Sequence, residues 1–175
     1  IEKYENISDN MELEIANYLN NVSEGRLSSE SKLEIRGMLR EVTEIESIGD
    51  SCYNLARTVN RKRTGGNDFT EKQYEHIHQM MQLTENALKH MVAIVEDDAH
   101  VVDVNHSFNI ENEMNNYRSQ LKNQNILDVN NKEYDYQMGV HYMDLIGECE
   151  KLGDYVVNVV EARTNVKEKK TNENR

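Results

Sequence analysis

The chain has 175 residues, enough for one domain or two small ones, and its acidic residues outnumber its basic ones 32 to 20, for a net charge of −12. This negative charge argues against nucleic acid as a partner, because a surface that binds phosphate backbones has to be basic. Proline is absent and only 6% of the residues are aromatic, a composition that disfavours β-sandwiches and doubly wound folds and favours long helices.

The first two predicted helices cover residues 1–24 and 28–63. Apolar residues recur every three or four positions in both, which predicts that each helix buries one face. In the first helix this stripe consists of Tyr4, Ile7, Met11, Ile15, Tyr18 and Val22. In the second helix it consists of Ile35, Met38, Val42, Ile45, Ile48, Cys52, Leu55 and Val59. Because the chain opens at Ile1, inside the first helical pattern, we interpret it as part of a longer protein.

A loop is predicted at residues 64–67, and the third helix follows it, running to about residue 97. Thr70 and Gln73 have the spacing of a capping box, and Phe69 and Tyr74 that of a hydrophobic staple, so the start of this helix is well marked. The fourth helix is predicted within about 103–124.

The fifth predicted helix covers about 131–166, with Asn130 and Glu133 as its cap. Its apolar residues follow a heptad pattern, which predicts a buried stripe. This stripe consists of Met138, Tyr142, Leu145, Cys149, Leu152, Val156 and Val159. Residues 167–175 are polar without a period, and we expect a disordered tail there.

The second and fifth helices contain similar segments. Residues 44–54 (EIESIGDSCYN) share five identities with residues 148–158 (ECEKLGDYVVN), which lie 104 positions later. The preceding helices also match loosely, through Glu5-x-x-x-Asp9 in the first and Glu111-x-x-x-Asn115 in the fourth. The pair of first and second helices therefore repeats as the fourth and fifth.

The third helix has no counterpart in the first repeat. The repeat therefore predicts an all-α fold of two antiparallel three-helix bundles, about five long helices in which the first helix of repeat 1 is missing. Residues 1–63 would form this incomplete first repeat, and residues 64–166 the second.

Each repeated segment carries two acids four residues apart, Glu46 with Asp50 and Glu150 with Asp154. Such pairs lie on one helix face, and their repulsion costs a few tenths of a kcal/mol. A cation would reverse this penalty, because hard cations and several transition metals accept carboxylate oxygens. We therefore predict a metal site of unknown metal identity, flanking the apolar stripes. The candidate ligands are Glu5, Asp9, Glu46, Asp50, Glu111, Glu150 and Asp154. The alternative interpretation is a solvated acidic surface.

A second alternative is a di-metal carboxylate enzyme. Glu75-x-x-His78 has the spacing of the E-x-x-H unit of di-iron bundles, but such sites need a second unit and inward-facing ligands. The chain offers only Asp97-x-x-His100 and Asp103-x-x-His106, near a predicted helix end. Because there is also no Ser/His/Asp pattern or phosphate-binding glycine loop, we do not expect an enzyme. A purely structural dimerisation bundle is the third alternative.

The two E-x-[Ile/Leu]-Gly-Asp-x-x-x-Asn segments, beginning at Glu46 and Glu150, resemble the PhoU family, whose three-helix repeats each carry an E/D-x-x-x-D signature. Residues 114–121 and 142–161 look most similar to the C-terminal PhoU-like domain of bacterial sodium/phosphate cotransporters. Asn115 departs from the signature, because an amide replaces the second carboxylate.

The resemblance implies a regulatory domain of phosphate transport that binds metal through these carboxylates. It implies a location on the cytoplasmic side of the bacterial inner membrane. The implied partners are the transmembrane transport domain of the same protein and phosphate. An apolar stripe left exposed beside the missing helix would favour a homodimer.

Overall fold

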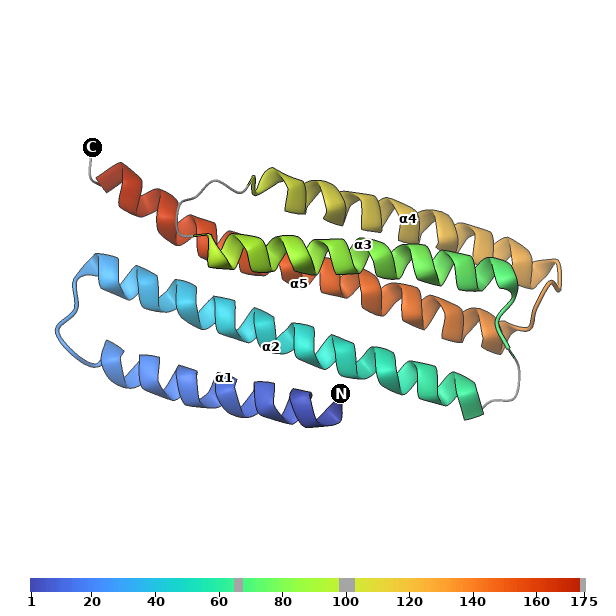
Figure 1. Ribbon diagram of the computed structural model, residues 1–175, viewed down its shortest axis with the longest axis horizontal. Helices are drawn as coiled ribbons and strands as arrows, with labels where there is room; N and C mark the ends of the chain where they lie inside the picture. The colour runs from blue at the N-terminus through green and yellow to red at the C-terminus, as the bar shows by residue number, and fades with distance from the viewer. Residues whose placement is uncertain (65–67, 98–102, 174–175) are drawn as a thin grey trace.

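The computed structural model describes residues 1–64, 68–97 and 103–173, with side chains as far as Thr164. It contains five helices, α1 (Glu2–Ser23), α2 (Ser29–Thr64), α3 (Glu71–Glu96), α4 (Asn105–Asn130) and α5 (Tyr136–Glu173), as Figure 1 shows. The predicted all-α fold and its five helices are thus confirmed. Residues 65–67 of the predicted loop, His100, and residues 174–175 lie outside the described residues.

The helices form a hairpin attached to a three-helix unit. α1 and α2 run antiparallel, α3, α4 and α5 pack on one another, and α2 lies along α5 (Figure 1). Within the described residues α1 contacts α2 only. None of the described helices is both long and apolar enough to span a bilayer.

The core is centred on α5, which is covered by α2, α3 and α4. All seven residues of its predicted heptad stripe are buried, and none is more than 6% exposed. The prediction for this helix is confirmed, because neighbours on several sides leave no place where the stripe could face water. From α3 and α4, Met80 and Met114 enter the same core with no exposed surface.

The apolar stripe of α1 faces outward, and the prediction that it is buried is wrong. Tyr4 is 74% exposed, Met11 55% and Tyr18 68%, whereas Leu19 is the buried residue of this helix. Because α2 is its one neighbour among the described helices, α1 can bury only one narrow face. That face carries polar residues such as Ser8, Asp9 and Glu12. The stripe of α2 is divided in the same way. Ile35 is buried, but Met38, Ile45 and Val59 are exposed.

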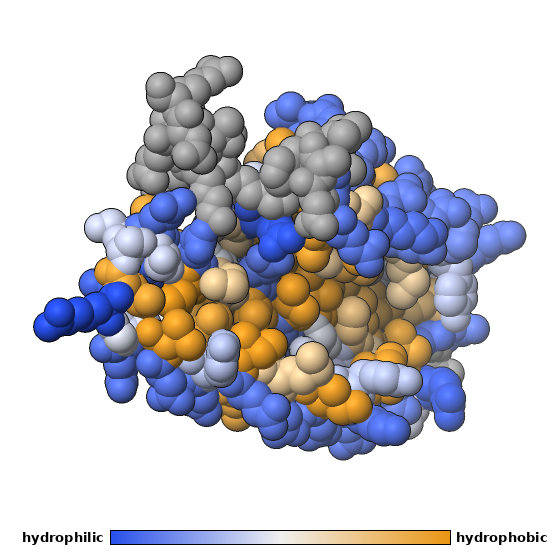
Figure 2. Space-filling view, turned by 60° about the vertical axis from the view of Figure 1, so that its left-hand side comes forward, coloured by the Kyte–Doolittle hydropathy of each residue, from blue (hydrophilic) through white to orange (hydrophobic). Residues whose placement is uncertain are grey.

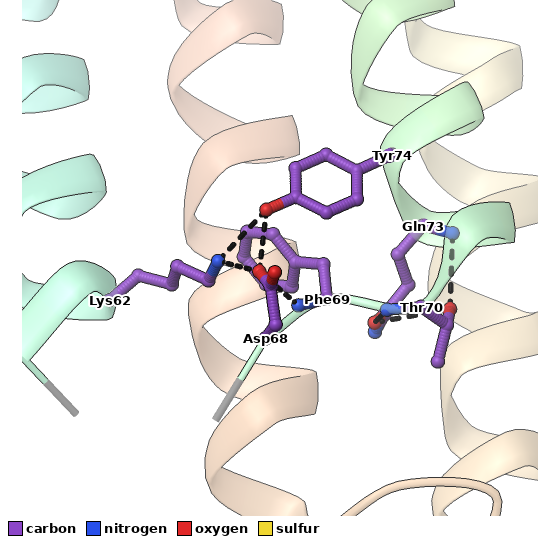
Figure 3. Close-up of polar contacts among 6 residues, drawn as sticks. All are labelled: Lys62, Asp68, Phe69, Thr70, Gln73 and Tyr74. Carbon is purple, nitrogen blue, oxygen red and sulfur yellow. Dashed lines mark hydrogen bonds and ion pairs between the residues drawn. The ribbon is translucent and has the colours of Figure 1, made fainter. Parts of the chain in front are cut away.

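The start of α3 is tied to the end of α2 by a cluster of polar and aromatic side chains (Figure 3). The predicted capping box is present, since the Thr70 hydroxyl accepts a 3.2 Å hydrogen bond from the backbone amide of Gln73. Phe69 and Tyr74 meet edge to face with ring centroids 5.6 Å apart, which confirms the staple. Lys62 of α2 forms an ion pair with Asp68 and lies 4.8 Å above the Phe69 ring.

The boundaries of α4 and α5 differ from the prediction. α4 continues to Asn130, so Asn130 and Glu133 do not cap the next helix. Asp135 does, by accepting a 2.7 Å hydrogen bond from the backbone amide of Met138, because it directly precedes the first residue of α5 and Asp is a favoured N-cap residue. The backbone of α5 is helical to Glu173, past the predicted end at residue 166, in a segment of Lys and Glu that are good helix formers.

Candidate functional site

The α1–α2 pair is built around a close approach of two small residues. A Cβ added to Gly49 of α2 would lie 3.3 Å from the hydroxyl of Ser8 on α1. Gly49 therefore lets the two helices approach closely at this level. The acidic residues next to Ser8 and Gly49 are carried toward one another by this contact.

Three of the predicted ligands converge at this point. Carboxylate oxygens of Glu5, Asp9 and Asp50 lie within 4.8 Å of one another, and within the described residues this is the sole group of three potential metal ligands at that spacing. Glu5 and Asp9 are partly buried, and Asp50 is exposed. One oxygen of Asp9 is buried without a hydrogen-bond partner. A cation among these oxygens would satisfy it and reverse their repulsion.

Two further acids border this group. Partial burial, and then the charges of Asp50, Glu12 and Asp9, raise the pKa of Glu46. Glu12, which the sequence analysis did not single out, also accepts a 3.0 Å hydrogen bond from the Thr43 hydroxyl of α2. Burial, followed by the charges of Asp9 and Asp50, raises the pKa of Glu5 as well. The α1–α2 carboxylate cluster therefore consists of Glu5, Asp9, Glu12, Glu46 and Asp50.

The corresponding place on α4 and α5 has different chemistry. A Cβ added to Gly153 of α5 would lie 3.0 Å from the sulfur of Met114 on α4, so the helices approach here as they do at Gly49. The Glu111 carboxylate accepts a hydrogen bond from the Asn115 amide. Arg118 forms a 3.4 Å ion pair with Glu150. Arg118 was not among the residues predicted from the sequence, and it lies one turn beyond the Glu111–Asn115 segment.

The charge of Arg118 acts on both acids of the α5 motif. Burial raises the pKa of Glu150 and of Asp154, and the Arg118 guanidinium opposes this rise in each. We call Glu111, Asn115, Arg118, Glu150 and Asp154 the α4–α5 cluster. It contains a positive charge of its own, which the α1–α2 carboxylate cluster does not.

The residues of the alternative di-metal site do not point into the bundle. Glu75 and His78 are both exposed on α3, and the His78 ring forms a 3.1 Å hydrogen bond with Gln82 of the same helix. Such enzymes hold their metals with ligands that face inward from several helices. Glu75 and His78 therefore lack the geometry that this alternative requires.

Residues 77–162 match the PhoU domain. This segment runs from α3 through α4 to Ala162 in α5, and so contains the α4–α5 cluster but not the α1–α2 carboxylate cluster. Among curated proteins, none matches the chain. The match supports the predicted PhoU-like family and a helical regulatory domain of phosphate homeostasis.

Proposed function

We propose that the chain is a metal-binding regulatory domain of a sodium-dependent phosphate transporter, located on the cytoplasmic side of the bacterial inner membrane. The observation that carries the metal-binding part is the convergence of Glu5, Asp9 and Asp50, with one Asp9 oxygen left unsatisfied. The PhoU domain at residues 77–162 supports the connection to phosphate.

The structure suggests how a cation could act as a signal. α1 is held by α2 alone among the described elements, and like charges face each other across this contact. A bound cation would bridge the two helices and stabilise α1 on α2, whereas its loss would weaken the pair. A cation held by carboxylates also keeps coordination positions for other oxygen ligands, so it could bind phosphate or the transport domain.

The proposal is tested by measuring thermal unfolding and Mn²⁺ binding of the full chain, with and without inorganic phosphate. We expect Mn²⁺ at 100 times its dissociation constant to stabilise the protein by about 2.7 kcal/mol. The double variant D9N/D50N should lose this stabilisation. The control E71Q/E75Q also removes two negative charges, from exposed acids of α3 that lie outside the cluster, and should keep it.

The pH dependence of binding has a predicted sign. Because the pKa values of Glu5 and Glu46 are raised, these groups take up protons at a higher pH than usual, and protons then compete with the metal. Mn²⁺ affinity should therefore fall as the pH is lowered from about 7 to about 5. If the wild type binds no Mn²⁺, or if D9N/D50N binds as well as E71Q/E75Q, the metal-binding proposal is wrong. If the wild type binds no Mn²⁺ and D9N/D50N is more stable than the wild type, the chain is a purely structural bundle.

We also propose that the exposed apolar residues of the hairpin form the interface of a homodimer. The exposed members of the two predicted stripes are Tyr4, Ile7, Met11, Ile15, Tyr18 and Val22 on α1 and Met38, Ile45 and Val59 on α2, and Ile1, Leu13 and Leu33 are exposed as well. A groove is lined by Ile1 and by Cys52 and Val59 of α2. Figure 2 shows apolar side chains gathered in the lower half of the view. Large contiguous apolar patches on a protein surface mark interaction sites.

The place of α3 in the other repeat supports this interface. α3 contacts α5 through a 2.9 Å hydrogen bond between the His76 ring and the Tyr142 hydroxyl, and Arg163 of α5 donates to the Val95 carbonyl of α3 at 3.1 Å. The residues 104 positions earlier, Met38 and Val59, have no such cover. A helix from a second copy would fill the equivalent place.

Sedimentation of the full chain tests this interface. We expect a dimer for the wild type, and a monomer with an unchanged helix content for the double variant M11K/I45K. The control E14K changes an exposed residue of α1 and should leave the dimer intact. A monomeric wild type would contradict the homodimer and leave another partner, such as the transport domain, to cover the face.

A further inference from the structure

We propose that Arg118 occupies, in the α4–α5 cluster, the position that a metal ion takes in the α1–α2 carboxylate cluster. The chain would then have one cluster open to metal and one closed by its own side chain. The part of this inference that concerns metal rests on the proposed function. The part that concerns Arg118 rests on the α4–α5 contacts alone.

The two clusters can be superimposed through their glycines. Gly49 approaches Ser8, and Gly153, 104 positions later in the chain, approaches Met114. Ser8 and Met114 are 106 positions apart in the sequence. A shift of 106 positions also relates Glu5 to Glu111 and Asp9 to Asn115. The same shift relates Glu12 to Arg118. Arg118 therefore stands where the first repeat has its fifth acid.

The charges of the two clusters follow from this exchange. The α1–α2 carboxylate cluster has five acids and no compensating base among its members. The α4–α5 cluster has three acids, one amide and one guanidinium. The Asn115 side-chain amide donates a hydrogen bond to Glu111, and the Arg118 guanidinium forms a 3.4 Å ion pair with Glu150, so each glutamate already has a partner within the cluster.

This arrangement explains why the second cluster fails to converge as a metal site. A guanidinium that is paired with Glu150 repels an incoming cation and uses the carboxylate oxygen that would bind it. Glu111, Glu150 and Asp154 are not among the described groups of three closely spaced ligands, whereas Glu5, Asp9 and Asp50 are. Arg118, together with the amide of Asn115, thus distinguishes the repeat that is closed to metal from the one that is open to it.

The test converts the second cluster into a copy of the first. The double variant N115D/R118E gives α4 the same spacing of acids as Glu5, Asp9 and Glu12. The matched control K122E/N123D makes the same change of charge at two exposed residues of the same helix. Mn²⁺ binding to the full chain is counted by titration calorimetry. We expect N115D/R118E to bind one more Mn²⁺ per chain than the wild type and K122E/N123D to bind the same number.

A second comparison needs no metal. R118Q removes the positive charge from the cluster, and K122Q removes one from an exposed residue a turn away. In metal-free buffer we expect R118Q to unfold at a lower temperature than K122Q, and added Mn²⁺ to restore R118Q selectively. Equal unfolding temperatures for the two variants would overturn the assignment of Arg118 as an internal counter-ion.

The outcomes separate this inference from the proposed function. If the wild type binds Mn²⁺ and N115D/R118E binds no more than K122E/N123D does, the inference is wrong and the proposed function stands. If the wild type binds none but N115D/R118E does, the assignment of Arg118 as the group that excludes metal from the α4–α5 cluster is supported, whereas the proposed function and the metal-open α1–α2 cluster are wrong. If neither the wild type nor any variant binds Mn²⁺, the metal-binding parts of both the inference and the proposed function are wrong.

Discussion

The hairpin of α1 and α2 and the pair of α4 and α5 share a helical repeat but use it differently. In both, a glycine lets two antiparallel helices approach closely. Around Gly153 the neighbour is the fully buried Met114, while around Gly49 it is the partly buried Ser8. The comparison shows that one backbone arrangement supports an apolar core with internal charge pairing in one repeat and an uncompensated acidic cluster in the other.

The difference continues along the helices. α3 covers α4 and α5, and this cover buries Ile110 and Leu121 of α4. The residues 106 positions earlier, Tyr4 and Ile15, are exposed because no described helix covers them. The stability of the second repeat should therefore depend on packing, and that of the first on charge.

The largest expected effect tests packing at the equivalent positions Met114 and Ser8. M114A removes a side chain with no exposed surface and should lower the free energy of unfolding by about 2–5 kcal/mol. S8A should change it by less than about 0.5 kcal/mol, because Ser8 fills no apolar core. Urea unfolding of both variants measures the difference. Similar losses for the two would show that the α1–α2 contact is packed as tightly as α4–α5.

A smaller effect tests charge by giving the first repeat the base of the second. E12R places a cation at the position equivalent to Arg118, and should stabilise the metal-free chain by about 0.5–1 kcal/mol while weakening Mn²⁺ binding. E14R makes the same change of charge at an exposed residue of α1 and serves as the control. If E12R is no more stable than E14R, or keeps the Mn²⁺ affinity of the wild type, the two clusters are not equivalent.

Local signals identified much of the fold before any tertiary information. The capping box at Thr70 and the heptad of α5 depend on residues a few positions apart, and both are present. The cap of α5 was missed because Asn130 and Asp135 both have the residue type of an N-cap. The choice between them depended on how far α4 continued.

The candidate site was predictable in part. The repeat in the sequence located Glu5, Asp9 and Asp50, which the fold brings together. Glu12 and Arg118 were missed, although extending the aligned helices by one turn would have found both. The distances between ligands could not be predicted, because they depend on the close approach at Gly49 and Gly153.

The sequence by itself determined where helices form and which residues share a helix face, because capping and periodicity act within one or two turns. It could not determine which face of α1 meets α2. Periodicity reports that an apolar stripe exists, but burial requires a second element to cover it, and α1 has only one neighbour among the described helices. Only the tertiary structure decided that its acids turn toward α2 and that its apolar stripe faces outward.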